Sequence, residues 1–166
     1  EPAFVKGLVE VQDEGSQLAA LFSGAKAGDQ VVDLCAGAGG KTLALAAMME
    51  NKGQIFATDD DKRRLAPIHD RLKRSGARNV QVRTPKSVGG EIADLAGRCD
   101  LVLIDAPCTG TGAWRRNPDA KWRMRPGALE QRVKEQAEIL DRAVGLLKPG
   151  GRIAYVTCSV IDEENA

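Results

Sequence analysis

Histidine is nearly absent from this sequence, since its 166 residues contain only one. Imidazole is the usual general base of enzymes and the commonest metal ligand, so chemistry built on histidine is not expected. No apolar run approaches the roughly 18 residues that a membrane-spanning helix needs. No charged-then-apolar segment of the signal-peptide type is present either. These absences predict a cytoplasmic protein without a membrane partner.

A strong net charge is also lacking, because 24 Lys and Arg balance 23 Asp and Glu to leave +1. No global positive field therefore indicates a nucleic-acid partner. The length is that of one ordinary domain. Hydrophobic residues make up 43% of the chain, which is typical of a globular protein with a real core.

Cysteine is the reactive residue type that the chain does contain, at positions 35, 99, 108 and 158. The four never approach C-x-x-C spacing, and with a single histidine they predict no metal site. Nothing else in the chain is typical of a secreted protein, so we expect all four thiols to be reduced. Cys35 and Cys99 lie beside apolar strands, where a buried thiol is the ordinary explanation.

Apolar runs alternate with helical patterns along the chain. After a lead-in over about 1–28, the sequence predicts strands over 30–35, 54–58, 79–83, 101–104 and 153–157. It predicts helices over 41–49, 61–75 and 90–96. A long helix is indicated by apolar residues at helical spacing, namely Leu129, Val133, Leu140, Val144 and Leu147, and is expected to end before Pro149-Gly150-Gly151. This order is typical of a doubly wound, mostly parallel α/β sheet.

Residues with chemical potential follow four of the predicted strands. Cys35 to Lys41 follow the first strand, Asp59 the second, Asp105 to Cys108 the fourth and Cys158 the fifth. Ligands of doubly wound sheets bind beyond the carboxyl ends of the strands. We therefore expect these residues to converge on one site.

The turn after the first strand has no bulky side chain, which allows a ligand to approach backbone N–H groups at a helix start. Its candidate ligand-binding residues are Cys35, Ala36, Gly37, Ala38, Gly39, Gly40 and Lys41. A P-loop is one interpretation, because Gly40, Lys41 and Thr42 fit, but Cys35 occupies the first glycine position. A dinucleotide turn is another, with Thr42 in place of its third glycine.

An S-adenosylmethionine turn is the third interpretation of the same residues. Asp33 leads into the bend, Gly37 and Gly39 give it room, and Asp59 lies where a ribose-binding acid is expected. The turn alone leaves these three ligands open.

Two cysteine motifs carry a family resemblance. Asp105-Ala106-Pro107-Cys108 and Thr157-Cys158-Ser159 resemble the paired boxes of the RNA (cytosine-5) methyltransferases of the Sun/Nop2 type. The segment 12–16 resembles the leading motif of that family, 35–42 its cofactor loop and 115–119 its linking segment. The resemblance runs over nearly the whole chain.

The resemblance implies a Rossmann-like class I methyltransferase fold and an S-adenosylmethionine cofactor bound also by Asp59 and Asp105. It implies that Cys158 adds to carbon 6 of a cytosine, which activates carbon 5 for methylation. By the same resemblance, Cys108 assists the elimination that releases the product, and Asp105 contacts the base. Lys41 is expected to favour a thiolate or to steady the intermediate.

Two departures from the family pattern concern the cofactor. The family loop usually carries a proline where Ala36-Gly37-Ala38-Gly39 stands here. The family often has an Asp after the third strand to contact adenine, whereas the stretch 83–87 contains no acid. Family members also continue with a helix and a closing β-hairpin, so residues 1–166 are expected to be the catalytic part of a longer protein that lacks this hairpin here.

A basic segment with two tryptophans follows the first cysteine box. Its candidate RNA-binding residues are Trp114, Arg115, Arg116, Lys121 and Arg123. Basic side chains neutralise phosphates and aromatic rings stack on unpaired bases, although composition alone fits a solvated loop equally well. The resemblance favours RNA, and ribosomal RNA over transfer RNA. The alternatives are a P-loop-like nucleotide-binding module and an RNA-binding relic of the fold without catalysis.

Overall fold

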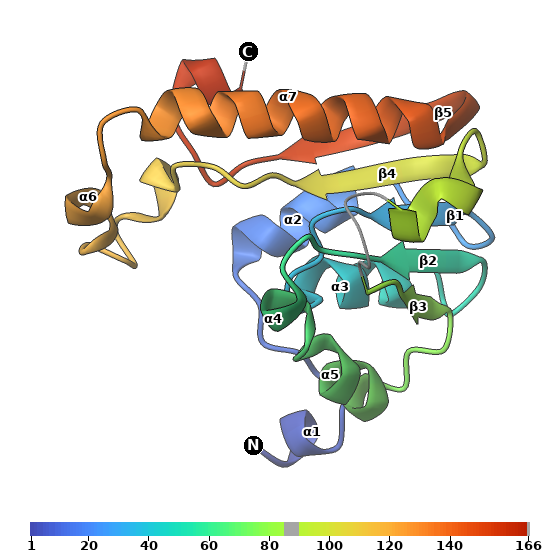
Figure 1. Cartoon of the computed structure of the whole chain (residues 1–166). Helices are drawn as coiled ribbons and strands as arrows, with labels where there is room; N and C mark the ends of the chain where they lie inside the picture. The colour runs from blue at the N-terminus through green and yellow to red at the C-terminus, as the bar shows by residue number, and fades with distance from the viewer. Residues whose placement is uncertain (85–89, 166) are drawn as a thin grey trace.

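Five parallel strands form a single sheet in the computed structural model of the chain, which describes residues 1–84 and 90–165 (Figure 1). The strands are β1 (Gln30–Asp33), β2 (Gln54–Ala57), β3 (Val80–Val82), β4 (Cys99–Asp105) and β5 (Leu147–Val156). Their order is β3-β2-β1-β4-β5, so the chain reverses direction across the sheet between β3 and β4. The doubly wound parallel sheet predicted from the sequence is confirmed.

Seven α-helices and three 3₁₀ turns precede, connect or follow the strands in the described residues. The helices are α1 (Pro2–Val5), α2 (Glu14–Phe22), α3 (Gly40–Met48), α4 (Lys62–Leu65), α5 (Ile68–Ser75), α6 (Ala120–Arg123) and α7 (Ala128–Leu146). The 3₁₀ turns are η1 (Gly90–Leu95), η2 (Thr111–Ala113) and η3 (Asp162–Glu164). The predicted helix over 90–96 is therefore the 3₁₀ turn η1. Within the described ranges, no helix has the length and apolar character to span a membrane.

The core has two sides because alternate residues of each strand point to opposite faces of the sheet. One side packs Val32, Leu34, Val102 and Ile104 against Ile139, Ala143 and Leu146 of α7. The other side packs Val31, Ile55, Leu101 and Leu103 against Leu45 and Ala46 of α3 and against Met49, which follows it. Both faces of the central strands are thus buried, which explains their continuous apolar runs.

The single helix predicted over 61–75 is wrong, because the chain breaks between α4 and α5. Pro67 lies at the break and lacks the N–H that a helix interior needs, and its ring clashes with the preceding turn. The predicted end of the helix is confirmed, since Gly76 caps α5 in the left-handed conformation at φ 68°.

The predicted apolar face of the long helix is partly wrong. Val144 is 62% exposed, and Leu147 is the first residue of β5. The expected stop at 149–151 falls inside β5, which pairs with β4 through a register shift. The residues of α7 that are buried are Gln136, Ile139, Ala143 and Leu146.

The N-terminal segment is bound to α5 and to the turn after β1. Glu10 accepts hydrogen bonds from Arg71, at 2.9 Å, and from Arg74, whose guanidinium also lies 3.9 Å from the Phe4 ring centroid. Arg71 donates in addition to the carbonyl of Ala38, at 2.8 Å. Figure 1 shows α1 beside α5 as a result.

A substitution at Gly39 tests how closely the turn after β1 packs against Ile68 of α5. Its φ is 82°, and an added Cβ would lie 2.4 Å from Cγ1 of Ile68. We expect Gly39→Ala to lower the free energy of unfolding by about 2–4 kcal/mol, from left-handed strain and from overpacking together. Urea unfolding monitored by circular dichroism measures this loss.

Gly76→Ala is the matched control, because Gly76 has φ 68° and open space around the added Cβ. It is expected to lose only the backbone contribution, about 1–2 kcal/mol. Equal losses in the two variants would contradict the predicted contact with Ile68.

Candidate active site

The predicted functional residues lie along the edge of the sheet where β1, β2, β4 and β5 end. These strands are parallel, and the segment that carries η2 and α6 projects from the same edge (Figure 1). Lys41 is in the first turn of α3, and Asp105 is the last residue of β4. Cys108 and Cys158 follow β4 and β5. The structure brings all four together, as their places after the predicted strands led us to expect.

The turn after β1 is fixed by hydrogen bonds that its backbone N–H groups donate to the segment after β2. The N–H of Ala36 donates to the carbonyl of Thr58 at 2.9 Å, and the N–H of Gly37 donates to Oδ2 of Asp59 at 2.9 Å. Gly37 and Gly39 both have positive φ, which lets the turn pass directly into α3 at Gly40. The amino end of α3 therefore faces the edge of the sheet.

Asp59, which follows β2, is buried, with 3% of the residue exposed. Its Oδ1 accepts the N–H of Asp61 at 2.9 Å, while Oδ2 accepts the N–H of Gly37 and lies 3.6 Å from Arg64. The carboxylate thus joins the end of β2 to the glycine turn. Because each carboxylate oxygen has two lone pairs, it retains acceptor capacity for a ligand.

Lys41 and Asp105 form a hydrogen-bonded ion pair. Nζ of Lys41 lies 2.7 Å from Oδ2 of Asp105. The Lys41 side chain is largely buried, whereas that of Asp105 is 41% exposed. The carboxylate therefore offers its free oxygen to the cleft while the lysine holds its orientation.

The two candidate catalytic cysteines are in direct contact. Sγ of Cys108 lies 3.3 Å from Sγ of Cys158, and both are free thiols, as are Cys35 and Cys99. Cys158 is exposed and Cys108 is half-buried. One sulfur can donate to the other at this distance, so the pair shares a proton-donor and acceptor role.

The hydrogen bond between the two sulfurs separates their acidities. Donation from the Cys108 thiol lowers the pKa of Cys158 to about 6, with a smaller contribution from the Lys41 charge, against burial and the Asp105 charge. The same bond, together with burial, raises the pKa of Cys108 far above the usual range. Cys158 is therefore the thiolate of the pair near neutral pH, and Cys108 is its donor.

The other two cysteines are not activated. Burial, together with the charges of nearby acids, raises the pKa of Cys35 to about 12 and that of Cys99 to about 11. Cys99 is fully buried and donates to the carbonyl of Leu95. The interpretation of Cys99 as a buried thiol is confirmed, whereas Cys35 is partly buried and lines the cleft.

Asp33 is a fully buried acid at the end of β1. Its Oδ2 accepts from Oγ1 of Thr42 at 2.6 Å, and its buried Oδ1 has no hydrogen-bond partner in the described parts of the chain. Burial raises the pKa of Asp33 to about 7, although the Thr42 hydrogen bond opposes the shift. A buried acceptor without a partner is costly, so this oxygen is suited to a ligand donor.

Two neighbouring cavities share Cys35 and Arg64 as lining residues. The first, of about 590 Å³, is lined by Asp33, Lys41 and Asp105 and by the glycine turn. The second, of about 420 Å³, is lined by residues that include Asp59, Pro107, Ile139 and Arg142. The cleft thus runs from the buried Asp33 to the end of β2.

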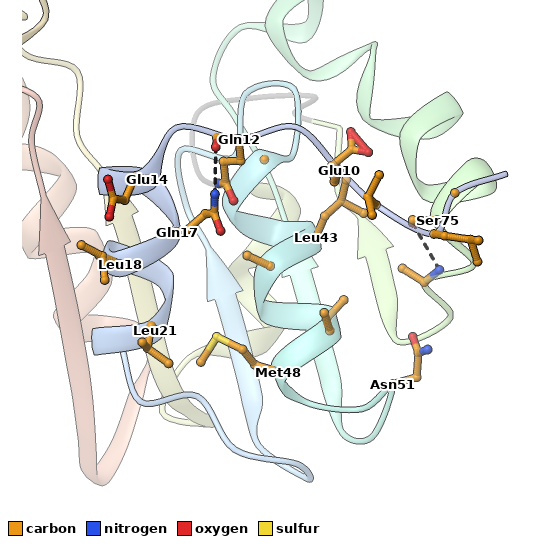
Figure 2. Close-up of a pocket in the computed structure, with 18 residues that line it drawn as sticks. Glu10, Gln12, Glu14, Gln17, Leu18, Leu21, Leu43, Met48, Asn51 and Ser75 are labelled. Atoms are coloured by element: carbon orange, nitrogen blue, oxygen red, sulfur yellow. Dashed lines mark hydrogen bonds between the residues drawn. The ribbon is translucent and has the colours of Figure 1, made fainter. Parts of the chain in front are cut away.

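A larger cavity, of about 770 Å³, lies between the N-terminal segment, α2 and α3. Figure 2 shows Leu18 and Leu21 on α2, and Leu43 and Met48 on α3, around it. No cysteine, lysine or arginine is among its described lining residues. Its size therefore does not make it the reactive site.

The basic segment after the first cysteine box is mostly exposed. Trp122 on α6 is 80% exposed, and Nζ of Lys121 lies 4.8 Å from its ring centroid. Trp114 is half-buried, and its Nε1 has no acceptor in the described part of the chain. Arg116 is ion-paired with Asp13.

Arg115 is exposed, as is Arg123, which lies 3.9 Å from Asp119. The structure thus presents Trp122 on the surface and leaves Trp114 partly enclosed. The two tryptophans are therefore not equivalent candidates for stacking.

Sequence reasoning missed Glu164, a buried acid of η3. Its carboxylate accepts the N–H of Thr109 at 2.8 Å and Nε2 of Gln136 at 3.0 Å. The position in an acidic run, 162–164, gave no signal of burial. For the stretch 83–87, where no adenine-contacting acid was found, residues 85–87 lie outside the described residues. No group of three potential metal ligands gathers among the described side chains.

A protein-family model described as 16S rRNA methyltransferase RsmB/F matches residues 21–166. The chain is 40% identical over 166 residues to ribosomal RNA small subunit methyltransferase B of Salmonella heidelberg (strain SL476), which covers 99% of the chain. The chain spans 38% of the length of that relative.

Solved structures from Pyrococcus horikoshii are also similar. NSun6 with SFG superposes with a TM-score of 0.87 at 32% identity, over 99% of this chain and 41% of that chain. A methyltransferase homolog protein gives a TM-score of 0.83 at 34% identity, over 99% and 50%. The fold is the Rossmann-like class I fold of S-adenosylmethionine-dependent methyltransferases, as predicted.

The acidity of Cys158 predicts a pH profile for alkylation. The rate of iodoacetamide modification of Cys158 is expected to rise through a midpoint near pH 6, because the thiolate is the nucleophile. Cys108→Ala removes the donor, so the midpoint is expected to rise toward the ordinary thiol value of about 8.5. Peptide mass spectrometry after short exposures at each pH measures both.

Cys35 and Cys99 are internal controls in the same digest and are expected to remain unmodified below about pH 9, because the pKa of each thiol is raised. A midpoint near 8.5 in the parent protein would contradict the role of Cys108 as donor.

Proposed function

This chain belongs to the RsmB/F family of 16S rRNA methyltransferases, and from that premise we propose that it transfers a methyl group to carbon 5 of a cytosine in small-subunit ribosomal RNA. The methyl donor is S-adenosylmethionine, and the reaction passes through a covalent bond between Cys158 and the base. Residues 1–166 act as the catalytic part in this proposal. The chain spans 38% of the length of the Salmonella heidelberg relative.

The observation that carries this proposal is the pair of free thiols beside the Lys41–Asp105 ion pair. Two cysteines in contact, one activated and one a donor, match a reaction that needs a nucleophile and a partner for its release. The acid at the end of β4 lies where it can orient a base. A single buried thiol would not support this chemistry.

The cleft fits S-adenosylmethionine at several points. Oδ1 of Asp33, buried and without a described partner, suits the ammonium group of the methionine part. The amino end of α3 suits its carboxylate, because unpaired N–H groups and the helix dipole favour an anion. Asp59, with spare acceptor capacity, suits the ribose hydroxyls at the second cavity.

The thiolate of Cys158 begins the reaction by adding to carbon 6 of the cytosine, which moves electron density to carbon 5. When bound, S-adenosylmethionine would supply an electrophilic methyl group to carbon 5, and its sulfur–methyl bond would break to leave the neutral thioether S-adenosylhomocysteine. Asp105 holds the polar edge of the base through its exposed carboxylate oxygen, and Lys41 keeps that carboxylate oriented. A depressed pKa makes Cys158 reactive without a histidine base.

Release requires two bonds to break. A base removes the proton from carbon 5, the double bond between carbons 5 and 6 re-forms, and the bond between carbon 6 and Sγ of Cys158 breaks. The Cys108 thiol assists by donating a hydrogen bond to the departing sulfur, 3.3 Å away. This stabilises the leaving thiolate and completes the cycle.

The exposed basic segment supplies the RNA contact in this proposal. Trp122 stacks on an unpaired base, and Arg115, Lys121 and Arg123 neutralise phosphates. The target cytosine leaves its stack to reach the cleft, as base-modifying enzymes require.

Methyl transfer from labelled S-adenosylmethionine to small-subunit ribosomal RNA tests the proposal in the full-length protein. Cys158→Ala is expected to reduce the rate by on the order of 10³-fold or more, because the nucleophile is lost. Cys108→Ala is expected to accumulate a protein–RNA adduct that survives denaturing electrophoresis, because release is impaired. Transfer RNA provides the alternative substrate arm.

Cys99→Ala is the matched control, since it removes a thiol outside the cleft and is expected to do neither. Near parent activity in Cys158→Ala would overturn the mechanism. A shift of melting temperature with ATP and magnesium but none with S-adenosylmethionine would instead favour a nucleotide-binding module. RNA binding without any methyl transfer would favour a non-catalytic role.

Asp33→Asn is expected to separate stability from cofactor binding. Burial raises the pKa of Asp33 to about 7, whereas in the unfolded chain an Asp titrates near 3.9. The folded state therefore binds more protons between these values, and the stability of the parent protein falls as pH rises from about 4 to 7. Asn has no such loss, so the variant gains on the order of 2–4 kcal/mol relative to the parent between about pH 5 and pH 8.

The same variant is expected to bind S-adenosylmethionine roughly 10- to 100-fold more weakly, because a charged hydrogen bond is lost. Urea unfolding at the two pH values and calorimetric titration of the cofactor measure the two effects. Asp70→Asn on the exposed side of α5 is the control that changes neither. Unchanged cofactor affinity in Asp33→Asn would contradict the proposed ammonium contact.

A further inference from the structure

The segments that carry the two cysteines lie beyond the end of the sheet ladder. The β4–β5 pairing ends at Asp105 and Val156, and beyond it backbone bonds run from the N–H of Ala106 to the carbonyl of Val156, at 2.8 Å, and from the N–H of Gly112 to the carbonyl of Cys158, at 2.9 Å. Past that point the strand pairing no longer determines where Cys108 and Cys158 lie. Another set of contacts must hold the two loops so that their sulfurs meet at 3.3 Å.

Hydroxyl groups next to the cysteines provide part of that contact. Thr109 follows Cys108 and Ser159 follows Cys158, and their hydroxyl oxygens are 3.2 Å apart. The Thr111 hydroxyl oxygen lies 3.1 Å from the same Ser159 hydroxyl and accepts a hydrogen bond from the N–H of Val160. The two loops are therefore joined immediately beside both reactive sulfurs.

Glu164 is the buried acceptor to which this network is hydrogen-bonded. The residue is 2% exposed, and its carboxylate accepts both the N–H and the hydroxyl of Thr109. It also accepts Nε2 of Gln136 on α7, at 3.0 Å, and that amide donates to the carbonyl of Pro107 at 2.9 Å. The residues on either side of Cys108 are thus both fixed by the Glu164–Gln136 pair.

Charge and burial agree with a dedicated role for this carboxylate. Burial disfavours the ionised form, yet hydrogen bonds from Ser159, Thr109 and Gln136 outweigh it and lower the pKa of Glu164. A buried, ionised acid persists only where donors surround it. By contrast, the neighbouring Glu163 is exposed.

We propose that Glu164 is a positioning residue, which fixes Thr109 and thereby holds the Cys108 thiol within hydrogen-bonding distance of the Cys158 sulfur. It acts through hydrogen-bond geometry and not through its negative charge at the sulfurs. The consequence for RNA methylation, slowed release of the product, rests on the function proposed above.

Alkylation of Cys158 across a pH series in the full-length protein tests the positioning without RNA or cofactor. Glu164→Ala releases Thr109, so Cys108 no longer donates, and the alkylation midpoint is expected to rise by roughly one to two pH units. Glu164→Gln keeps an acceptor for the Thr109 N–H and is expected to restore the midpoint to within about half a unit. Glu163→Ala is the matched control and leaves the midpoint unchanged.

Thr109→Val provides a second variant in case Glu164→Ala fails to fold. It preserves shape, removes the hydroxyl links to Glu164 and Ser159, and is expected to raise the midpoint in the same direction. Near-ultraviolet circular dichroism verifies folding of each variant. Parent-like midpoints in folded Glu164→Ala and Thr109→Val would overturn the proposal, as would a midpoint in Glu164→Gln as high as in Glu164→Ala.

A separate incubation with RNA and S-adenosylmethionine distinguishes this proposal from the proposed function. Glu164→Ala is expected to accumulate the denaturation-resistant protein–RNA adduct, as Cys108→Ala does. A raised midpoint without any adduct in either variant would support the positioning role and contradict the proposed release chemistry. An adduct with a parent-like midpoint would overturn the positioning role and support the covalent mechanism.

Discussion

The parallel pairing of β1, β4 and β5 brings the segments that carry Lys41, Asp105 and the two reactive cysteines to one edge of the sheet. β4 pairs with β1 through Asp33 and Leu103 and with β5 through Asp105 and Val156, so the three strands end at one edge. The first turn of α3 and the loops after β4 and β5 leave from that edge. Residues distant in the sequence thus become neighbours at this edge. What the sheet does not set is the last few ångströms, which depend on local hydrogen bonds.

Two buried carboxylates show how those hydrogen bonds decide the chemistry. Asp33 and Glu164 are equally hidden from solvent, yet burial raises the pKa of Asp33 whereas its donors lower the pKa of Glu164. Asp33 has one donor and an oxygen without a described partner, which suits ligand binding. Glu164 is surrounded by donors, which suits a structural anchor. Burial alone therefore does not define the role of an acid, and the number of donors around it does.

The parallel sheet and the convergence of both cysteine boxes were predictable because apolar runs and glycine turns mark the strands and their ends locally in the sequence. Pro67 also indicates a break between α4 and α5, but the apolar residues on either side of it keep helical spacing and therefore suggested one continuous helix. The face of α7 was harder, because Val144 continues one apolar row while Gln136 lies in the buried one. The burial of Glu164 could not be predicted, since nothing in the sequence distinguishes it from Asp162 and Glu163. The contact between the sulfurs depends on a network of short polar side chains that no local pattern specifies.

A single guanidinium joins the N-terminal segment to the glycine turn, because Arg71 donates both to Glu10 and to the carbonyl of Ala38. Any opening that withdraws Arg71 removes a hydrogen bond from both acceptors at the same moment, and Glu10 is then held by Arg74. The two stretches therefore belong to one cooperative unit, whose backbone amides share a common free energy of local opening. In hydrogen exchange, protection of the turn that follows β1 is in this way coupled to the order of a segment some thirty residues earlier in the chain.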